Sequence, residues 1–163
     1  MDVLEAIETR RSVRRFKPEP IPKDVLSRIV NAGRLAPTAR NVQLWEFVVV
    51  TDAAKRQQIA DIAEYGKFIA EAPACIVVLS QPAKYYLEDG SAATTNMLLA
   101  AHGLGLGACW VAGDKKPYAA QIVSVCEAPP EFKLVAMIAL GHPAKIPAPK
   151  KRSLQDVLHW EAF

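Results

Sequence analysis

The chain has 163 residues, enough for one domain with a substantial core, and it contains no repeat or linker that would separate two domains. Its composition, 51% hydrophobic and 23% charged, excludes a disordered chain, and no apolar run approaches the roughly 20 residues of a membrane span. The net charge of +3 excludes a strongly polycationic binder of nucleic acid. Three cysteines without a C-x-x-C spacing argue against a disulfide scaffold and a metal site. We therefore expect one domain over residues 1–163, in a reducing cytoplasm.

The N-terminal part of the chain predicts two helices. Residues 2–10 form the first, and Asp2 and Glu5 are spaced like a capping box at its start. The second begins at Pro22, follows an apolar stripe at helical spacing and ends at Pro37, where a polar loop begins.

Four β-branched or apolar runs farther along the chain predict strands, and helices alternate with them. The expected strands are residues 45–51, which should be buried, 74–80, 108–113 and 132–141. The expected helices are residues 52–63, 88–104 and 114–126, and the tail at 153–160 carries apolar residues on one face. This interleaving predicts an α+β sandwich, in which helices cover a sheet.

A run of alternating glycines, Gly103, Gly105 and Gly107, resembles part of a dinucleotide-binding loop. Such a loop leads from a strand into a helix, whose N-terminus faces the phosphates. Here the glycines follow a predicted helix and lead into a strand, so we expect them to end that helix. The histidines and cysteines have no catalytic or metal-ligand spacing. Any difficult chemistry is therefore expected to belong to a cofactor.

Positive charge is concentrated in two short segments near the ends of the chain. Residues 10–17 hold five basic residues and residues 145–152 hold four, with no acidic residue in either. The remaining residues have a net charge of −6. Arginine side chains bind phosphate oxygens in a bidentate manner, so these segments could form an anion site. A nucleic-acid patch and a solvated run of charge are the alternatives that the residues alone leave open.

The polar loop PTARNVQ, residues 37–43, places Thr38, Asn41 and Gln43 between a helix and a strand. Amide side chains both donate and accept hydrogen bonds, as recognition of a heterocycle edge requires. Ordinary turn formation accounts for the same residue types, and the loop alone does not decide between the two interpretations.

Taken in order, six segments of this chain resemble the nitroreductase family of FMN-dependent oxidoreductases. They span nearly the whole sequence, and their order makes the resemblance specific although no single motif does. The segments are residues 10–16 (RRSVRRF), 36–50 (APTARNVQLWEFVVV), 71–79 (EAPACIVVL), 103–113 (GLGLGACWVAG), 134–144 (LVAMIALGHPA) and 149–160 (PKKRSLQDVLHW). The resemblance implies a central mixed sheet flanked by helices, in a homodimer with FMN at the interface.

The resemblance also implies which residues bind FMN. The implied phosphate contacts are Arg10, Arg11 and Ser12 near the N-terminus and Lys150 and Arg152 in the tail. Arg14 matches a basic position beside the flavin pyrimidine ring, where positive charge stabilises reduced flavin. The implied ring contacts are Pro37, Thr38, Ala39 and Asn41, together with Ala112 and Gly113, whose backbone N–H groups approach flavin N5.

The implied function is hydride transfer from NADH or NADPH through flavin N5 to nitroaromatic, quinone or similar acceptors, by a ping-pong mechanism. No side chain is assigned as catalytic, and Arg40 and Gln43 are candidate substrate contacts. Neither nucleic acid nor a membrane is expected as a partner. The alternatives are reductive dehalogenation or flavin fragmentation in the same superfamily, and a flavin-free module that binds anions or nucleic acid.

One connection departs from the family pattern. Only QPAKYYL joins the strand that ends at Ser80 to the next helix, where many family members have a longer helical insertion over the active site. A more open flavin site is therefore expected, and Lys67 is a candidate contact to flavin N3 and O4. The aromatic residues that could replace the missing cover, or simply pack, are Tyr65, Phe68, Tyr85 and Tyr86.

Overall fold

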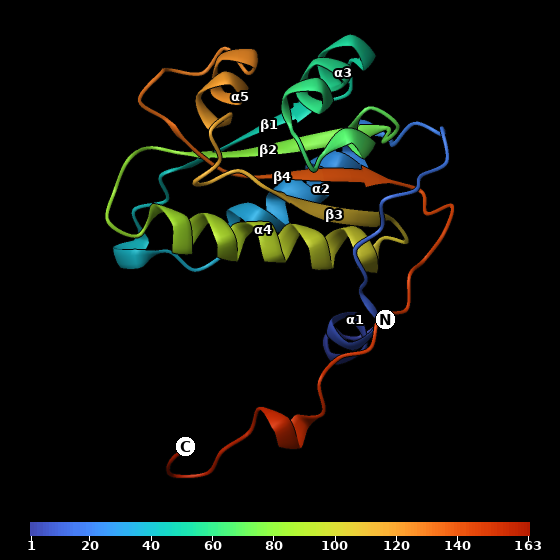
Figure 1. The fold of residues 1–163 in the computed structure, drawn as a ribbon, viewed down its shortest axis with the longest axis vertical. Helices are drawn as coiled ribbons and strands as arrows, with labels where there is room; N and C mark the ends of the chain where they lie inside the picture. Colours follow the sequence, from blue (N-terminus) through green and yellow to red (C-terminus); the bar gives the residue numbers. More distant parts are fainter.

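A four-stranded antiparallel sheet forms the centre of the protein, as seen in a computed structural model that describes residues 1–163 (Figure 1). Each strand is a run of apolar, mostly β-branched residues, which favour the pleated conformation. In spatial order the strands are β1 (Trp45–Val50), β2 (Ala74–Ser80), β4 (Lys133–Gly141) and β3 (Gly107–Ala112). The two central strands, β2 and β4, are almost completely buried, which places the core on both faces of the sheet.

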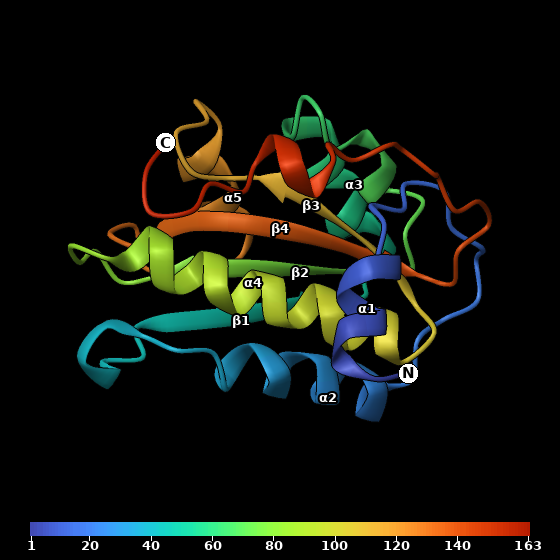
Figure 2. The same ribbon diagram turned by 90° about the horizontal axis from the view of Figure 1, so that it is seen from below.

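Helices cover both faces of this sheet, so the predicted α+β sandwich is confirmed (Figure 1). One face packs against α3 (Ala53–Ile62) and α5 (Ala119–Val125), and the other packs against α2 (Lys23–Arg34) and α4 (Tyr86–Gly103). The short helix α1 (Val3–Thr9) lies outside these layers, beside the C-terminal end of α4, and has no buried residue (Figure 2). None of these helices is long and apolar enough to cross a membrane.

The segment after α1 adds a short parallel pairing at one edge of the sheet. Ser12 forms a parallel bridge with Ala108, and the Val13 N–H donates to the Ala108 carbonyl at 2.9 Å. All pairs of long strands are antiparallel, so the sheet is antiparallel and not mixed as predicted. The one parallel pairing is this isolated bridge, which lies outside the named strands. It holds the N-terminal basic segment against the first residues of β3.

The structure corrects some predicted boundaries. The strand expected to be buried, β1, is an edge strand, and Val49 on it is 39% exposed. The helix expected to run to Pro37 ends at Arg34. The helix predicted from residue 114 begins only at Ala119, because the residues before it form turns that hydrogen-bond to β3 and β4. In the exposed tail only a single helical turn forms, η3 (Leu154–Asp156).

Close packing fixes the position of α4 on the sheet. A Cβ atom at Gly90, in the first half of α4, would lie 2.7 Å from a methyl carbon of Val135 on β4. A Cβ at Gly33 would lie 2.8 Å from the Met97 side chain, so α2 and α4 also approach closely. Because real Cβ atoms do not approach so closely, glycine at these positions lets α4 lie directly on β4 and α2.

We expect the three cysteines to resist thiol reagents in the folded protein. Burial raises the pKa of the Cys75 thiol to about 12 and that of Cys126 to about 11, and it also raises the pKa of Cys109. The reactive thiolate is therefore scarce at pH 8. Titration with a chromogenic disulfide at pH 8 should show almost no fast-reacting thiol before denaturation and three afterwards. Rapid stoichiometric reaction of the native protein would contradict this arrangement.

Candidate functional site

A basic hollow of about 580 Å³ lies where the two ends of the chain meet. It is lined by Arg10, Ser12 and Arg14 from the segment after α1 and by Lys151 with adjacent prolines from the tail. The only ion pair in the protein joins Lys55 to Glu127, far along the chain, so none of these basic residues has a carboxylate partner. Uncompensated positive charge that converges on one hollow is suited to binding an anion.

Arg11 also lines this hollow, but its guanidinium group has another role. It donates hydrogen bonds to the carbonyl oxygens of Glu8 at 2.7 Å and Arg10 at 2.9 Å. A cation at this position stabilises the C-terminal end of α1, where the carbonyl groups of the last turn lack helical partners. Its donors are therefore less available for a ligand than those of Arg10 and Arg14, for which no hydrogen bond within the chain is found.

The tail contributes a different residue to this hollow from those predicted. Lys151 lines it, whereas Lys150 and Arg152 do not. The guanidinium group of Arg152 donates to the carbonyl of Asp156, inside the tail's own turn. Neighbouring residues in an extended segment point in alternate directions, so a register difference of one residue decides which side chain faces the hollow. The structure thus brings the two basic segments together, with Lys151 at the point of contact.

A different set of groups lies at the other end of β3. The Gly113 N–H donates to no other group of the chain, while the neighbouring Asp114 N–H donates to the Val135 carbonyl at 3.2 Å. Gly113 itself packs so closely on β4 that a Cβ atom there would lie 2.5 Å from Cγ of Leu134. Ala112, next to it, is exposed. The Gly113 N–H is therefore a fixed backbone donor without a partner in the chain, at a buried residue beside the exposed Ala112.

The loop after α2 lies near the same end, at the start of α4. The Thr38 hydroxyl donates to the Asp89 carboxylate at 2.8 Å, and the Ala39 N–H donates to the other carboxylate oxygen at 3.0 Å. Beyond Ala39 the backbone enters the left-handed region at Arg40, Asn41 and Gln43, with φ values of 55°, 56° and 53°. Pro37, Arg40, Asn41 and Gln43 are exposed, and the loop presents its polar side chains outward.

The predicted ligand contacts therefore form two groups at opposite ends of β3 and α4. The basic group lies at the start of β3 and at the end of α4, where the Thr9 hydroxyl and His102 Nε2 are 2.8 Å apart. The second group, with Gly113 and the loop after α2, lies at the end of β3 and the start of α4. Along β3 the two groups are separated by roughly 16 Å, from a rise of about 3.3 Å per residue.

Residues 65–68, which lie between α3 and β2 in the chain, run beside β3 from one group to the other. A Cβ at Gly66 would lie 3.1 Å from the Val111 side chain, so the segment runs close to the strand. At one end of it the Arg14 guanidinium lies 5.9 Å from the centre of the Phe68 ring. At the other end the Lys116 ammonium lies 5.2 Å from the centre of the exposed Tyr65 ring. These two cation–π pairs border the surface between the basic hollow and Gly113.

Lys67 and the two tyrosines at the start of α4 each have a partner within the chain. The Lys67 ammonium donates to the carbonyl oxygens of Ala60 and Asp61, both at 2.9 Å, and so closes the C-terminal end of α3. Tyr85 is exposed beside Lys84. The hydroxyl of Tyr86 donates to the Asp114 carboxylate, and this hydrogen bond, more than burial, raises the pKa of Tyr86 to about 12.

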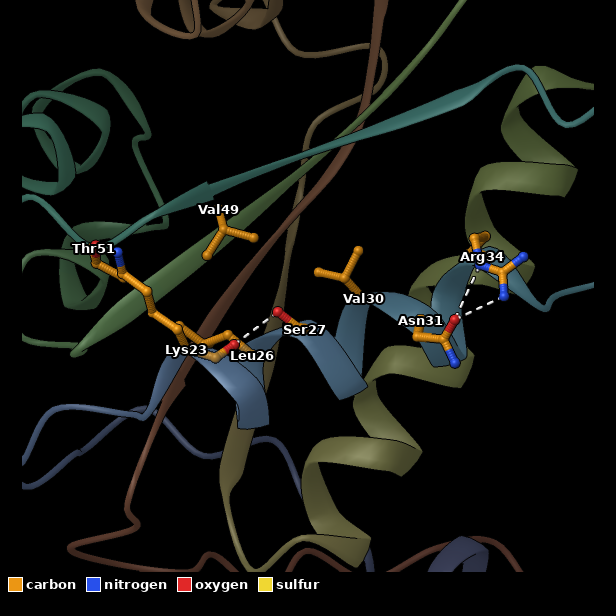
Figure 3. Close-up of a pocket in the computed structure, with 8 residues that line it drawn as sticks. All are labelled: Lys23, Leu26, Ser27, Val30, Asn31, Arg34, Val49 and Thr51. Carbon is orange, nitrogen blue, oxygen red and sulfur yellow. Dashed lines mark hydrogen bonds between the residues drawn. The ribbon is translucent and has the colours of Figure 1, made fainter.

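Another hollow lies elsewhere, between α2 and the edge strand β1 (Figure 3). It has a volume of about 620 Å³, and the side chains of Val30 and Val49 face each other across it. The Arg34 guanidinium at one end is held by Asn31, with both donors within 3.0 Å of its side-chain oxygen. This hollow is separate from both groups at β3 and does not bring together any of the predicted contacts.

The fold defines the chain as an α+β sandwich protein, and its sheet carries a basic hollow near the start of β3. The sequence signature of the Nitroreductase family matches residues 7–66 and 63–142. A Methanothermobacter thermautotrophicus protein named as an NADH dehydrogenase/NAD(P)H nitroreductase is 34% identical, and the alignment covers all of this chain and 88% of that protein. The chain belongs to the nitroreductase family and is an oxidoreductase.

Two further similarities concern ligands and chemistry. A nitroreductase from Desulfovibrio desulfuricans, solved in complex with FMN, superposes with a TM-score of 0.89 at 33% identity, covering 100% of this chain and 98% of that one. The iodotyrosine deiodinase of Danio rerio is 26% identical, over 91% of this chain and 63% of that protein.

Proposed function

We propose that this protein is an FMN-dependent NAD(P)H oxidoreductase that reduces nitroaromatic, quinone or similar acceptors by a ping-pong mechanism. The observation that carries the proposal is the pair of donor groups at the two ends of β3. Unpaired cations lie at one end, and an unpaired backbone N–H lies at the other. Phosphate and isoalloxazine are the two ends of FMN, and the separation of roughly 16 Å along the strand is one that an extended FMN molecule can bridge.

The residues that line the basic hollow fit the phosphate group of FMN. Arg10, Arg14 and Lys151 offer three cationic side chains without a carboxylate partner in the chain, and the Ser12 hydroxyl adds a neutral donor in the same hollow. Lys150 and Arg152 lie in the same tail segment, one residue to either side of Lys151. We propose that this segment and the segment after α1 together bind the phosphate of FMN, with Arg11 as a weaker contributor.

The residues at the ring end fit a flavin ring. Bound FMN would supply hydride chemistry at N5, with NADH or NADPH as the donor and the acceptor as the final oxidant. The Gly113 N–H is the donor that we assign to N5. Arg14, which the resemblance placed beside the pyrimidine ring, lines the basic hollow at the other end of β3, so we assign it to the phosphate. Because Ala112 is exposed, solvent can supply protons at this end, and no side chain is needed as an acid or base.

The proposal is tested on the purified protein. It should be yellow and hold one FMN per chain, and anaerobic NADH or NADPH should bleach the flavin. Subsequent addition of a nitroaromatic or a quinone should restore the flavin absorbance, with product formed at one equivalent per reduced site. A colourless protein that does not take up added FMN would contradict the proposal.

Reductive dehalogenation is a second candidate, favoured by the similarity to the Danio rerio deiodinase. The same reduced protein, mixed anaerobically with a halogenated tyrosine, distinguishes the two. Release of halide at a rate above that of nitroaromatic reduction would favour dehalogenation. Rapid reoxidation by nitroaromatics or quinones without halide release supports the first proposal.

We also propose that the protein is a homodimer with FMN at the interface. Helix α1 and the tail expose large apolar side chains, including Leu4 at 70% and Trp160 at 79%, and neither segment is covered by the rest of the chain. Several exposed large apolar side chains on one segment commonly mark a protein–protein interface. Sedimentation equilibrium should therefore give twice the chain mass of 17.8 kDa. A monomer that retains FMN at full affinity would contradict a site shared between two copies.

A further inference from the structure

The first turn of α4 carries two polar side chains on one face. Tyr86 and Asp89 are three residues apart, a spacing that places side chains next to each other on a helix surface. Both are half-buried, whereas Tyr85 and Glu88, each one position earlier, are exposed. From the sequence, Tyr86 was one of four aromatic residues that could cover the flavin or simply pack, and Asp89 was not selected. Each is hydrogen-bonded to a segment far away in the chain.

Asp89 holds the loop after α2 with both carboxylate oxygens. One accepts from the Thr38 hydroxyl at 2.8 Å, and the other accepts from the Ala39 N–H at 3.0 Å. The Thr38 oxygen in turn lies 3.3 Å from the Gln43 N–H, so the loop is closed on the same anchor. A carboxylate in the first turn of a helix also interacts favourably with the helix dipole.

Tyr86 holds the turn that follows β3. Its hydroxyl donates to the carboxylate of Asp114, the residue directly after Gly113. On the other side of the turn the Asp114 N–H donates to Val135 on β4, and the Lys116 N–H donates to the Gly113 carbonyl at 3.3 Å. The backbone at Gly113 is thus fixed by contacts with both the sheet and α4.

Backbone strain is concentrated in the same two segments. Six non-glycine residues of the chain have a left-handed backbone, and four of them lie in the loop after α2 or in the turn after β3. These four are Arg40, Asn41, Gln43 and Lys115. Such conformations are unfavourable for residues with a Cβ atom and persist where surrounding contacts hold them in place. The bonds from Tyr86 and Asp89 are the contacts that α4 supplies for this purpose.

We propose that the first turn of α4 is the positioning element of the flavin site, with Tyr86 orienting the turn at Gly113 and Asp89 orienting the loop at Thr38 and Ala39. The inference rests on the proposed function, because it takes these two segments as the contacts of the isoalloxazine ring. Tyr86 and Asp89 then act through the segments they hold and do not touch the cofactor. This one helix turn therefore sets the positions of both segments that would contact the isoalloxazine ring.

The test compares two variants with matched neighbours. Tyr86→Phe removes only the hydroxyl, and Asp89→Asn removes one of the two acceptor oxygens. Their controls are Tyr85→Phe and Glu88→Gln, which change exposed side chains in the same turn. The FMN dissociation constant should rise roughly tenfold in each of the first two, as expected for the loss of a hydrogen bond to a charged group, and should stay within about twofold in the controls.

Two readouts separate positioning from a general loss of stability. The midpoint potential of the bound flavin should shift in Tyr86→Phe and Asp89→Asn but not in their controls, because a displaced ring contact changes the affinities for oxidised and reduced flavin unequally. Amide exchange in the protein as purified should accelerate at residues 113–115 in Tyr86→Phe and at 38–41 in Asp89→Asn. Asp114→Asn keeps an acceptor oxygen for Tyr86 and should be milder than Asp114→Ala.

The possible results distinguish a failure of the positioning inference from a failure of the proposed function. If the variants match their controls in FMN affinity, potential and amide exchange, the first turn of α4 has no positioning role and the inference is wrong. If the wild-type protein binds no FMN, the proposed function fails instead. The exchange rates, which need no cofactor, still show whether Tyr86 and Asp89 hold the two segments.

Discussion

Replacing Arg10 with alanine is expected to weaken FMN binding by roughly 10- to 100-fold while leaving the thermal unfolding temperature nearly unchanged. A hydrogen bond to a charged group contributes about 1.5–3 kcal/mol, and each 1.4 kcal/mol is a factor of ten in affinity. The Arg10 side chain lines the basic hollow and has no hydrogen-bonding partner in the chain, so its removal breaks no internal contact of this kind. Titration of the flavin-free protein with FMN, followed by fluorescence quenching, measures the effect.

The matched control for this prediction is Arg11→Ala. Its guanidinium group already donates to the carbonyls of Glu8 and Arg10, so a smaller loss of FMN affinity and a slight loss of α1 stability are expected. Riboflavin, which lacks the phosphate, should bind the wild-type protein and Arg10→Ala equally. A further variant, Lys151→Ala, tests the tail residue that lines the hollow. If FMN affinity is unchanged in both Arg10→Ala and Lys151→Ala, the two basic segments do not bind the phosphate together.

The strands were the most predictable part of the fold because their signal is local. The apolar run at residues 74–80 forms β2 with the predicted boundaries, and both of its faces are buried. A continuous apolar run is the pattern of a strand with cores on both sides, which is the position that β2 occupies. The similar run at 45–51 was expected to be buried too, but β1 lies at the edge of the sheet. Strand order depends on contacts between distant segments, and a single run of residues does not encode it.

The predicted helix boundaries were wrong where tertiary hydrogen bonds compete with the local sequence pattern. Residues 114–118 have no strong breaker before Pro117, and their pattern fits the start of a helix. In the structure the Asp114 N–H bonds to β4, and the Tyr118 hydroxyl donates to the Ala112 carbonyl at 2.9 Å. These bonds hold the chain in turns until Ala119. Their partners are residues on other strands, so the sequence around residue 114 contains no sign of them.

The residues of the candidate site were likewise only partly predictable from the sequence. Clusters of arginine and polar loop residues are visible in the sequence, and the structure gathers Arg10, Ser12 and Arg14 on one hollow. The residues that hold its segments in place, Tyr86 and Asp89, could not be recognised as such from the sequence. Asp89 bonds to a loop about 50 residues away, and a lone acidic residue at a helix start is ordinary in composition. Only an alignment that shows paired changes at these positions could have revealed such contacts from sequences.

Replacing Gly113 with alanine is expected to destabilise the protein and to disturb the ring end of the site. The new Cβ atom would lie 2.5 Å from Cγ of Leu134 and 3.2 Å from the backbone nitrogen of Ala136. Both partners are buried in β4, so the strain has little room to relax. Overpacking of this kind costs about 1–3 kcal/mol, which for a domain of this size lowers the unfolding temperature by roughly 2–12 °C. Calorimetry and FMN titration of the same sample measure both effects.

Two further variants identify the cause of this loss. Gly103→Ala places a methyl group at the end of α4 with nothing within 4 Å, so it should leave the unfolding temperature unchanged or raise it slightly. Leu134→Ala removes the atom that the new methyl meets, so the double variant Gly113→Ala/Leu134→Ala should lose less stability than the sum of the two single variants. Additive losses would show that the two side chains do not compete for the same space. If Gly113→Ala has the same FMN affinity and the same unfolding temperature as the wild type, the backbone at Gly113 is not packed tightly against β4.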